Sequence, residues 1–301
     1  MDFGRLADIT RVDFSLPPDD PANKAVLNTF SSKGQPRFFA GCPVWGEKEW
    51  LGLIYPQDAR NKDLLKYYAQ QFNCIELNTT FYRMPVPQTV TGWKNAVTKN
   101  FRFCPKIPRE ISHERRLINC RELTQVFCDV MGNLENHLGP FFLQLPPQFG
   151  PQHTDRLLEY AAAFPREYRL CVEFRNEQWF TDRHNLDKVF DAFVSMGTGT
   201  VITDTAGRRD ALHQRLTTPA AFIRFTANDL HPTDFPRIDE WSFRLQEWIA
   251  QGLEEIYFFV HSPHHGKMPH LVNYAIQKLN ENCGAALRPC TFTDTIQPEL
   301  F

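Results

Sequence analysis

The chain has 301 residues, and its 33 basic and 35 acidic side chains nearly cancel to a net charge of -2. This balance gives no general affinity for nucleic acid or an anionic membrane surface, and no apolar run approaches the ~20 residues that a membrane span needs. The N-terminus, MDFGRLADITRVDF, has acidic residues where a signal peptide needs basic ones and lacks an apolar core, so we expect a cytoplasmic protein.

Cysteine usage agrees with a reducing compartment. Eight cysteines are present, none of them in a C-x-x-C pair, and Cys42, Cys74, Cys104 and Cys171 lie inside strand-like runs. This pattern predicts reduced, buried thiols rather than a disulfide framework or a zinc site.

The chain divides into an arm and a main body. Residues 1–36 are polar and contain several prolines, and the segment PPDDPANKAVLNTF predicts a short helix after Asp20 with Pro21 in its first turn. We expect this arm to pack on the outside of a single domain that spans residues 37–301.

Strand-like and helix-like runs alternate through the main body. The predicted strands are 37–45, 74–80, 102–107, 140–147, 168–175, 199–204, 220–226 and 255–262. The predicted helices are 63–72, 86–97, 121–136, 154–164, 184–197, 238–252 and 269–282, and the connection after Asp204 is a loop with at most a short helix. Thr154 is placed as a helix cap, and Gly197 and Gly252 are placed to end helices.

Eight strands, each followed by a helix or a long connection, predict a (β/α)8 TIM-type barrel. Their apolar character fits strands that are buried on both faces. A doubly wound open sheet is the competing fold. It loses support because no G-x-G-x-x-G turn and no phosphate-binding G-x-x-x-x-G-K-[ST] motif is present.

The stretch CIELNTTFYR, residues 74–83, changes from apolar to polar as its strand ends. Glu76, Asn78 and Thr80 are spaced by two, so an extended strand presents them on one face. This pattern predicts the lip of a pocket, and the alternative is a surface strand whose polar face meets water.

Polar residues end the other strands too, and the carboxyl ends of barrel strands carry the active sites of this fold. The strand-end residues are Trp45, Glu76, Asn78, Lys106, Gln144, Glu173, Arg175, Asp204, Arg224 and His261. Unpaired charges are rarely buried in strand cores, so we expect these side chains to gather around one opening. Structural alternatives are an ion pair between Glu173 and Arg175, a core histidine at 261 and a turn cap at Asp204.

These residue types fit acid–base chemistry on an anionic molecule. Glu76, Glu173, Lys106 and Asp204 are the candidate catalytic acids and bases. Lys106, Arg175 and Arg224 are candidate anion-binding cations. The aromatic residues Trp45, Phe81, Tyr82 and Trp179 are candidates for an apolar wall.

A divalent metal is the alternative use of the same residues. Glu76, Glu173, Asp204 and His261 offer oxygen and imidazole ligands that suit Mg²⁺, Mn²⁺ or zinc, but three nearby cations oppose such a site. We therefore predict no cofactor. His264, His265 and His270 of HSPHHGKMPH, residues 261–270, are expected to be mostly solvated, with a metal-binding patch as the alternative. The segment PREISHERR, residues 108–116, with His113, is either a lid or a solvated loop.

Several motifs resemble the YecE-like proteins, the domain-of-unknown-function family 72. They are GCPVWGEKEWLGLIYP, FNCIELNTTFYRMP, the run from Trp93 to Pro108 with ISH following, LGPFFLQLPPQF, LCVEFRNEQWF, VITDT, FIRFT and YFFVHSPHHGKMP, which together span about residues 37–275. The chain departs from the family in having GCPVW where relatives usually have a GTSGW-like run, and in its longer N-terminal arm.

The resemblance implies a TIM-type barrel with a pocket at the carboxyl ends of its strands. The positions that match are Trp45, Glu76, Asn78, Tyr82, Lys106, His113, Gln144, Glu173, Arg175, Asp204, Arg224 and His261. The family is related to sugar isomerases by fold alone, and fold alone does not establish an activity.

The leading hypothesis is therefore an enzyme for a small hydroxylated anion, such as a sugar acid or a sugar phosphate. In this hypothesis Glu173 or Glu76 is the base, Lys106 or Asp204 is the acid, and Arg175 and Arg224 bind the anion, with Trp45, Asn78, Tyr82, His113, Gln144 and His261 as further contacts. The alternatives are a metal-dependent phosphodiesterase or nuclease and a non-catalytic module that binds a small ligand. The sequence does not favour nucleic acid as a partner and does not indicate an oligomeric state.

Overall fold

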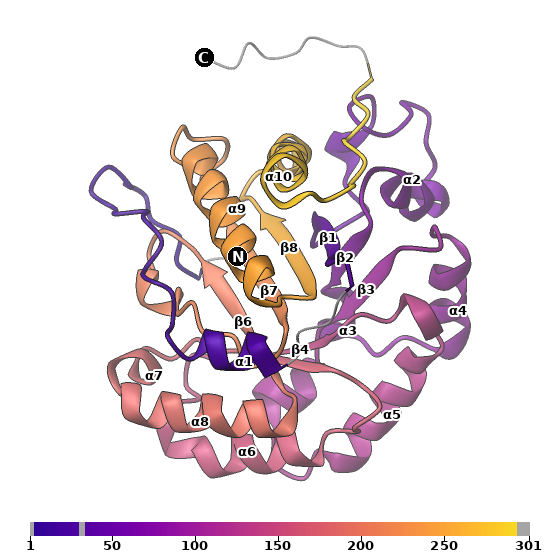
Figure 1. The fold of residues 1–301 in the computed structure, drawn as a ribbon. Helices are drawn as coiled ribbons and strands as arrows, with labels where there is room; N and C mark the ends of the chain where they lie inside the picture. The colour runs from indigo at the N-terminus through magenta and orange to yellow at the C-terminus, as the bar shows by residue number, and fades with distance from the viewer. Residues whose placement is uncertain (1–2, 30–33, 294–301) are drawn as a thin grey trace.

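Eight parallel strands form a closed barrel in the computed structural model of the protein, which describes residues 3–29 and 34–293 (Figure 1). The strands are β1 (Arg37–Cys42), β2 (Cys74–Leu77), β3 (Arg102–Pro105), β4 (Phe141–Gln144), β5 (Leu170–Glu173), β6 (Gly199–Asp204), β7 (Ala220–Thr226) and β8 (Glu255–His261). They lie in the order β3-β2-β1-β8-β7-β6-β5-β4. The Ile107 amide donates to the Phe142 carbonyl at 2.9 Å and joins the ends of this order.

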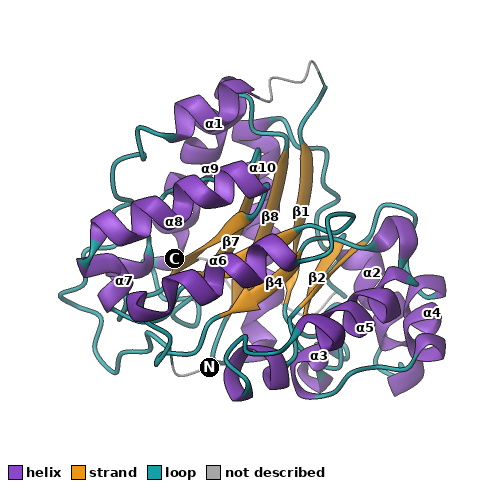
Figure 2. Ribbon diagram, turned by 90° about the horizontal axis from the view of Figure 1, so that it is seen from below, coloured by secondary structure: helices purple, strands orange, loops and turns teal. Residues whose placement is uncertain are grey.

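The (β/α)8 prediction is confirmed, and the open-sheet alternative is wrong because β3 and β4 meet. The helices are α1 (Asn23–Thr29), α2 (Leu64–Gln71), α3 (Thr79–Tyr82), α4 (Pro87–Asn95), α5 (Arg121–Gly132), α6 (Thr154–Ala163), α7 (Gln178–Thr181), α8 (Arg183–Met196), α9 (Asp234–Gln251) and α10 (Met268–Cys283). Figure 2 shows the longer helices packed around the strands. No helix of the described ranges is both long and apolar enough to cross a membrane.

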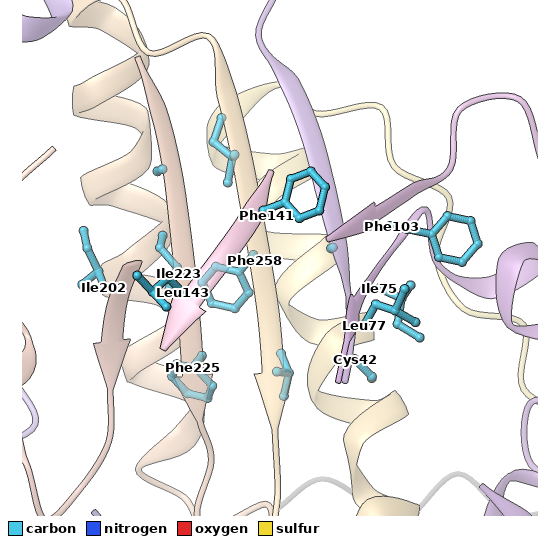
Figure 3. Packing of buried hydrophobic residues seen from close by; sticks show 14 of the residues in the cluster. Cys42, Ile75, Leu77, Phe103, Phe141, Leu143, Ile202, Ile223, Phe225 and Phe258 are labelled. Atoms are coloured by element: carbon cyan, nitrogen blue, oxygen red, sulfur yellow. The ribbon is translucent and has the colours of Figure 1, made fainter. Parts of the chain in front are cut away.

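Two apolar clusters lie on the two faces of the strands. The interior cluster contains Phe39, Cys74, Cys104, Phe142, Cys171, Val201, Phe222, Tyr257 and Phe259, one or two from each strand. The larger cluster joins strands to helices, and Figure 3 shows strand members of it such as Ile75, Ile202 and Phe258. Because side chains of a strand alternate between its faces, both clusters follow from the nearly continuous apolar runs of the sequence.

The helices bury one face each. Trp241, Leu245 and Trp248 are fully buried on α9 at helical spacing, as amphipathic packing requires. Gly197 and Gly252 end α8 and α9 with φ of 68° and 117°, so the prediction that glycines close these helices is confirmed. Thr154 is not the cap of α6, because the cap position is His153 and the Thr154 hydroxyl bonds to the Pro151 carbonyl instead.

The arm occupies the place of a missing barrel helix. Residues 205–219, all within the described chain, contain only a 3₁₀ turn, Arg209–Ala211, and α1 of the arm packs against α9 beside this connection (Figure 1). Asn23 is fully buried, and its side chain bonds to the Gln214 carbonyl and the Leu216 amide at 2.7 Å each. The arm thereby provides hydrogen-bond partners for backbone groups that a helix at this position would otherwise cover.

The segment after β2 leaves the strand earlier than predicted. β2 ends at Leu77, Asn78 has helical backbone angles, and α3 begins at Thr79. Thr80 is therefore not on the same face as Glu76. Its buried hydroxyl bonds to the carbonyls of Leu77 and Lys106, at 2.8 and 2.7 Å, and ties the end of β2 to the end of β3.

Candidate functional site

A ring of polar side chains lies directly above the interior apolar cluster. Each member follows an interior residue by two positions, as Glu76 follows Cys74 and Arg224 follows Phe222, so it points to the same side of its strand. We call these residues the polar ring: Glu76, Lys106, Gln144, Glu173, Thr203, Arg224 and His261, from β2 to β8 in chain order. The alternation of the strands thus gathers distant parts of the sequence at one end of the barrel.

Arg224 is the centre of the polar ring. Its Nε and Nη2 donate to the Glu76 carboxylate at 2.8 and 3.0 Å, and its Nη1 donates to both Glu173 oxygens at 2.8 and 2.9 Å. All three residues are at most 1% exposed. The guanidinium therefore holds the two carboxylates together, and the substrate-binding role of Arg224 stays a prediction.

Both carboxylates of the polar ring are held ionised. Burial opposes the charge on Glu173, but Arg175 and Arg224 outweigh it and lower its pKa to about 2. Burial likewise opposes the charge on Glu76, and Arg224 and His261 hold its pKa well below the usual value. A carboxylate with such a low pKa is a weak base at neutral pH, so these two residues are poor candidates for proton abstraction.

Lys106 lies at the edge of this network. Its Nζ donates to Gln144 Oε1 at 2.9 Å, and the Gln144 amide donates to Glu173 Oε2 at 2.6 Å. Burial and the nearby Arg224 charge lower the Lys106 pKa to about 7. Lys106 is therefore a polar ring residue that gains and loses a proton near neutral pH.

Glu76 has two further partners. His261 Nε2 lies 3.0 Å from its Oε2 and the Asn78 amide donates to its Oε1 at 2.8 Å. Since the carboxylate accepts, His261 carries its proton on Nε2. Burial lowers the His261 pKa even beside Glu76, which favours the neutral imidazole.

Arg175 extends the network toward the N-terminal arm. Its Nε and Nη2 donate to Glu173 Oε1 at 3.1 and 2.9 Å, and Thr203 donates to the same oxygen at 2.9 Å. The Phe3 ring lies over the guanidinium, with 3.9 Å from Cζ to the ring centroid. The arm therefore reaches the carboxyl end of the barrel, in addition to packing on its outside.

Aromatic and loop residues cover the polar ring. The Phe81 centroid is 4.2 Å from Lys106 Nζ, and the His113 ring packs edge-on to Phe81 at 5.0 Å. Burial first, and then the charges of Lys106 and Arg109, lower the His113 pKa to about 4. His113 thus lies beside the site in a positive field.

Two of the predicted contact residues, Tyr82 and Trp45, lie at the margin of the polar ring. Tyr82 is 77% exposed and its ring packs edge-on with that of Phe81, with 5.1 Å between the centroids. Trp45 is half-buried and packs edge-on against Trp93 of α4 at 5.9 Å. Trp179 is fully buried in the outer cluster, where its indole donates to the Phe149 carbonyl, so its place in an apolar wall of the site was wrongly predicted.

Asp204 does not join the polar ring. Thr203, its neighbour on β6, points inward to Glu173, so Asp204 faces the surrounding helices. Its carboxylate bonds to Arg237 and to the Trp241 indole at 2.7 and 2.9 Å, and to Arg209. Asp204 therefore lies apart from the other predicted catalytic residues, and its contacts are those of a structural anchor between β6 and α9.

The sequence interpretation missed two contributors to the site, Thr203 and Phe3, and gave a third, Phe81, another role. Thr203 follows the interior Val201 by two positions, but Asp204 follows the equally apolar Ile202 by two, so the local sequence does not choose between them. Phe81 was considered only as a wall residue, although it covers Lys106. Phe3 had no local signal, because its contact with Arg175 joins residues far apart in the sequence.

The carboxylates of the polar ring face a cation of the protein itself. Within the described ranges, no group of three or more His, Cys, Asp or Glu residues is arranged to hold a metal ion. Two cavities, of about 160 and 470 Å³, lie away from the polar ring, one beside Tyr160 and one beside Arg166 and Met196. The arrangement at the barrel mouth is instead suited to moving a proton through Lys106.

Comparison with known proteins identifies relatives of this chain. The model of the family described as "Protein of unknown function DUF72" matches residues 39–293. "UPF0759 protein YecE" of Escherichia coli K12 is 31% identical over 253 residues, which cover 78% of this chain and 90% of that protein. "UPF0759 protein YunF" of Bacillus subtilis is 23% identical over 150 residues, about half of each chain (48% and 52%).

Solved structures agree with the fold. A DUF72 family protein from Enterococcus faecalis has a TM-score of 0.65 at 19% identity, covering 82% of this chain and 98% of that one. A DUF72 family protein from Thermotoga maritima has a TM-score of 0.62 at 22% identity, covering 81% and 99%. From the extent of the family match and the identity to YecE, the chain belongs to the DUF72 family of proteins of unknown function.

Proposed function

We propose that the protein is an enzyme that transfers protons on a small hydroxylated anion, such as a sugar acid or a sugar phosphate. The observation that carries the proposal is the position of Lys106, whose Nζ ends a hydrogen-bonded chain through Gln144 to Glu173. These three hydrogen-bonded side chains lie at the carboxyl end of the barrel, where enzymes of this fold carry their active sites.

The burial of the charges supports a functional role over a structural one. Burying ion pairs such as those of Arg224 contributes little net stability, because desolvation opposes the attraction between the charges. Strongly shifted pKa values in a buried cluster are typical of functional sites. Stability alone therefore gives little reason to build this network at the barrel mouth.

The roles of the charged residues differ from those first expected. Lys106 is both base and acid, since its pKa of about 7 allows either protonation state in the working enzyme. Glu173 and Glu76 remain ionised and position the cations. Burial lowers the His113 pKa most, and the charges of Lys106, Arg109 and Arg175 add to this effect. The positive field of these three residues favours an anionic substrate.

The test is proton exchange on a panel of sugar acids and sugar phosphates in D₂O, followed by proton NMR. The protein should wash deuterium into a carbon-bound position of at least one compound or convert it to an isomer. Lys106→Met should lose this activity by roughly 10²–10⁴-fold. Lys66→Met, which removes an exposed lysine of α2, is the matched control and should keep full activity.

Two outcomes contradict the proposal. Exchange that continues at the normal rate in Lys106→Met, with both variants folded by circular dichroism, would remove Lys106 from the mechanism. Saturable binding of a panel compound with no exchange or conversion would indicate a ligand-binding module instead of an enzyme.

A further inference from the structure

Lys106 is placed to act as a nucleophile as well as a proton carrier. We propose that its Nζ adds to the carbonyl carbon of an open-chain sugar phosphate or a 2-oxo acid and forms a Schiff base. This inference rests on the proposed function, because it names the substrate class of the same site: an anion that carries a free aldehyde or ketone.

The contacts of Nζ fit a neutral amine. It donates a hydrogen bond to the uncharged Gln144 oxygen at 2.9 Å, and no carboxylate of the described residues forms an ion pair with it. The faces of Phe81 and Phe142 lie 4.2 and 5.7 Å away, and the residue is 6% exposed. The burial, rather than the ring faces, disfavours the ammonium form, because an aromatic face attracts a cation.

Two buried arginines add to this effect. The charges of Arg224 and Arg175 both oppose protonation of Lys106, after the larger effect of burial, and its pKa falls to about 7. A lysine that is desolvated or placed next to other cations is the form in which this side chain attacks carbonyl groups. The neutral amine is thus present at the pH at which the protein is expected to work.

The reaction balances with water and one proton. The nitrogen lone pair forms a C–N bond, the carbonyl π pair moves to oxygen, and a proton passes from nitrogen to that oxygen to give a carbinolamine. The hydroxyl group then leaves with a proton from solvent as water, and the nitrogen lone pair completes the C=N bond of the iminium ion. Water reverses both steps and releases the amine.

The positive iminium would lie beside Gln144 and within the field of Glu173 and Glu76, whose charges favour a cation on Lys106. Arg224 keeps these carboxylates ionised. They are weak bases in this state, but their negative charges stabilise the iminium ion. An iminium withdraws electrons from the adjacent carbon and makes its proton easier to remove. The covalent step therefore deepens the proton-transfer function.

The inference is tested by trapping the iminium. The full-length protein is incubated at pH 7 with dihydroxyacetone phosphate, glyceraldehyde 3-phosphate or pyruvate in the presence of sodium cyanoborohydride, which reduces iminium ions. Peptide mass mapping then follows the reduced adduct. With at least one probe, Lys106 should be labelled at least about ten-fold faster than the exposed Lys66.

Control reactions separate a built site from general glycation. Lys106→Arg keeps the positive charge but has no primary amine, and it should lose only the fast phase of labelling while Lys66 labels as before. Dihydroxyacetone, which lacks the phosphate, should label Lys106 more slowly than its phosphate ester does.

The outcomes distinguish this inference from the function beneath it. Labelling of Lys106 that is no faster than labelling of Lys66 with all three probes overturns the Schiff base. If the wild-type protein still exchanges substrate protons in D₂O and Lys106→Met does not, the proton-transfer function stands without it. If neither labelling nor exchange occurs, both proposals are wrong.

Discussion

Arg224 shows how much of the site depends on a single side chain. Its guanidinium donates to Glu76 and Glu173, and both carboxylates are fully buried. An ionised carboxylate without a partner is costly in such a place, because the interior offers it little solvation. The residue therefore sets the charge state of its neighbours, although it was expected to bind the substrate.

Replacing Arg224 with methionine should destabilise the protein by about 3–5 kcal/mol, since it removes the cation that two buried carboxylates share. Urea unfolding followed by circular dichroism measures the change. Arg60→Met is the matched control, because the Arg60 side chain is 72% exposed in its pair with Asp63, and the expected cost is within about 1 kcal/mol. Equal costs for the two variants would contradict the central position of Arg224.

The lowered pKa of Lys106 predicts that the free energy of unfolding rises with pH. Its folded pKa of about 7 lies below the unfolded value, so between pH 7 and about 10.4 the unfolded chain binds the additional proton and stability increases across this window. Integrated over that window, Lys106 should account for roughly 3–5 kcal/mol, by the same linkage.

The comparison of wild type with Lys106→Met isolates this contribution. The variant lacks the titrating group, so its stability should exceed the wild-type value by most at pH 6 and by least at pH 10, as urea midpoints would report. A difference between the two proteins that stays constant from pH 6 to pH 10 would show that Lys106 has an ordinary pKa.

At the scale of elements, α1 compensates for a helix that the barrel lacks. Residues 205–219 join β6 to β7 with only a short 3₁₀ turn, and Asn23 of α1 bonds to two backbone groups of this connection. Buried backbone groups need partners, so the arm is part of the barrel wall in energetic terms.

Asn23→Ala should cost about 2–4 kcal/mol, because it leaves the Gln214 carbonyl and the Leu216 amide buried without their partner. Asn28→Ala changes an exposed asparagine of the same helix and should stay within about 0.5 kcal/mol. Chemical denaturation of both variants decides the point, and a cost for Asn23→Ala no larger than its control would mean that the arm is only loosely attached.

β6 illustrates what the sequence could and could not predict. Its bounds, 199–204, were predicted correctly because glycine and an aspartate frame an apolar run. The residue that points into the barrel was not predicted correctly, because the length of the strand alone does not determine whether Thr203 or Asp204 faces the interior. The interior position of Val201 fixes it, and that position depends on the neighbouring strands.

For the whole molecule, local patterns predicted the barrel well and long-range contacts poorly. Apolar runs and helical spacing gave all eight strands and seven of the later helices, since these depend on nearby residues. The contact of Phe3 with Arg175 and the hydrogen bond of Asn23 to Gln214 join residues that lie far apart in the sequence. No local pattern predicts such contacts.

The polar ring is the feature on which the functional account depends, and its residues come from seven strands. Six of the twelve predicted site residues meet there because each follows an interior residue by two positions. Their charges act together: two carboxylates are fixed by arginines, and the remaining amine is left near neutrality. A change at any one of these residues should therefore alter the titration of Lys106.

The most direct test is an NMR titration of the Lys106 side chain, with ¹³C-labelled lysine and with Lys106→Arg to assign its signal. The account predicts a midpoint near the pKa of about 7, and a lower midpoint in Glu173→Gln, because Glu173 raises the Lys106 pKa and its loss removes that support. A Lys106 signal that titrates above pH 10 with the exposed lysines would contradict the account.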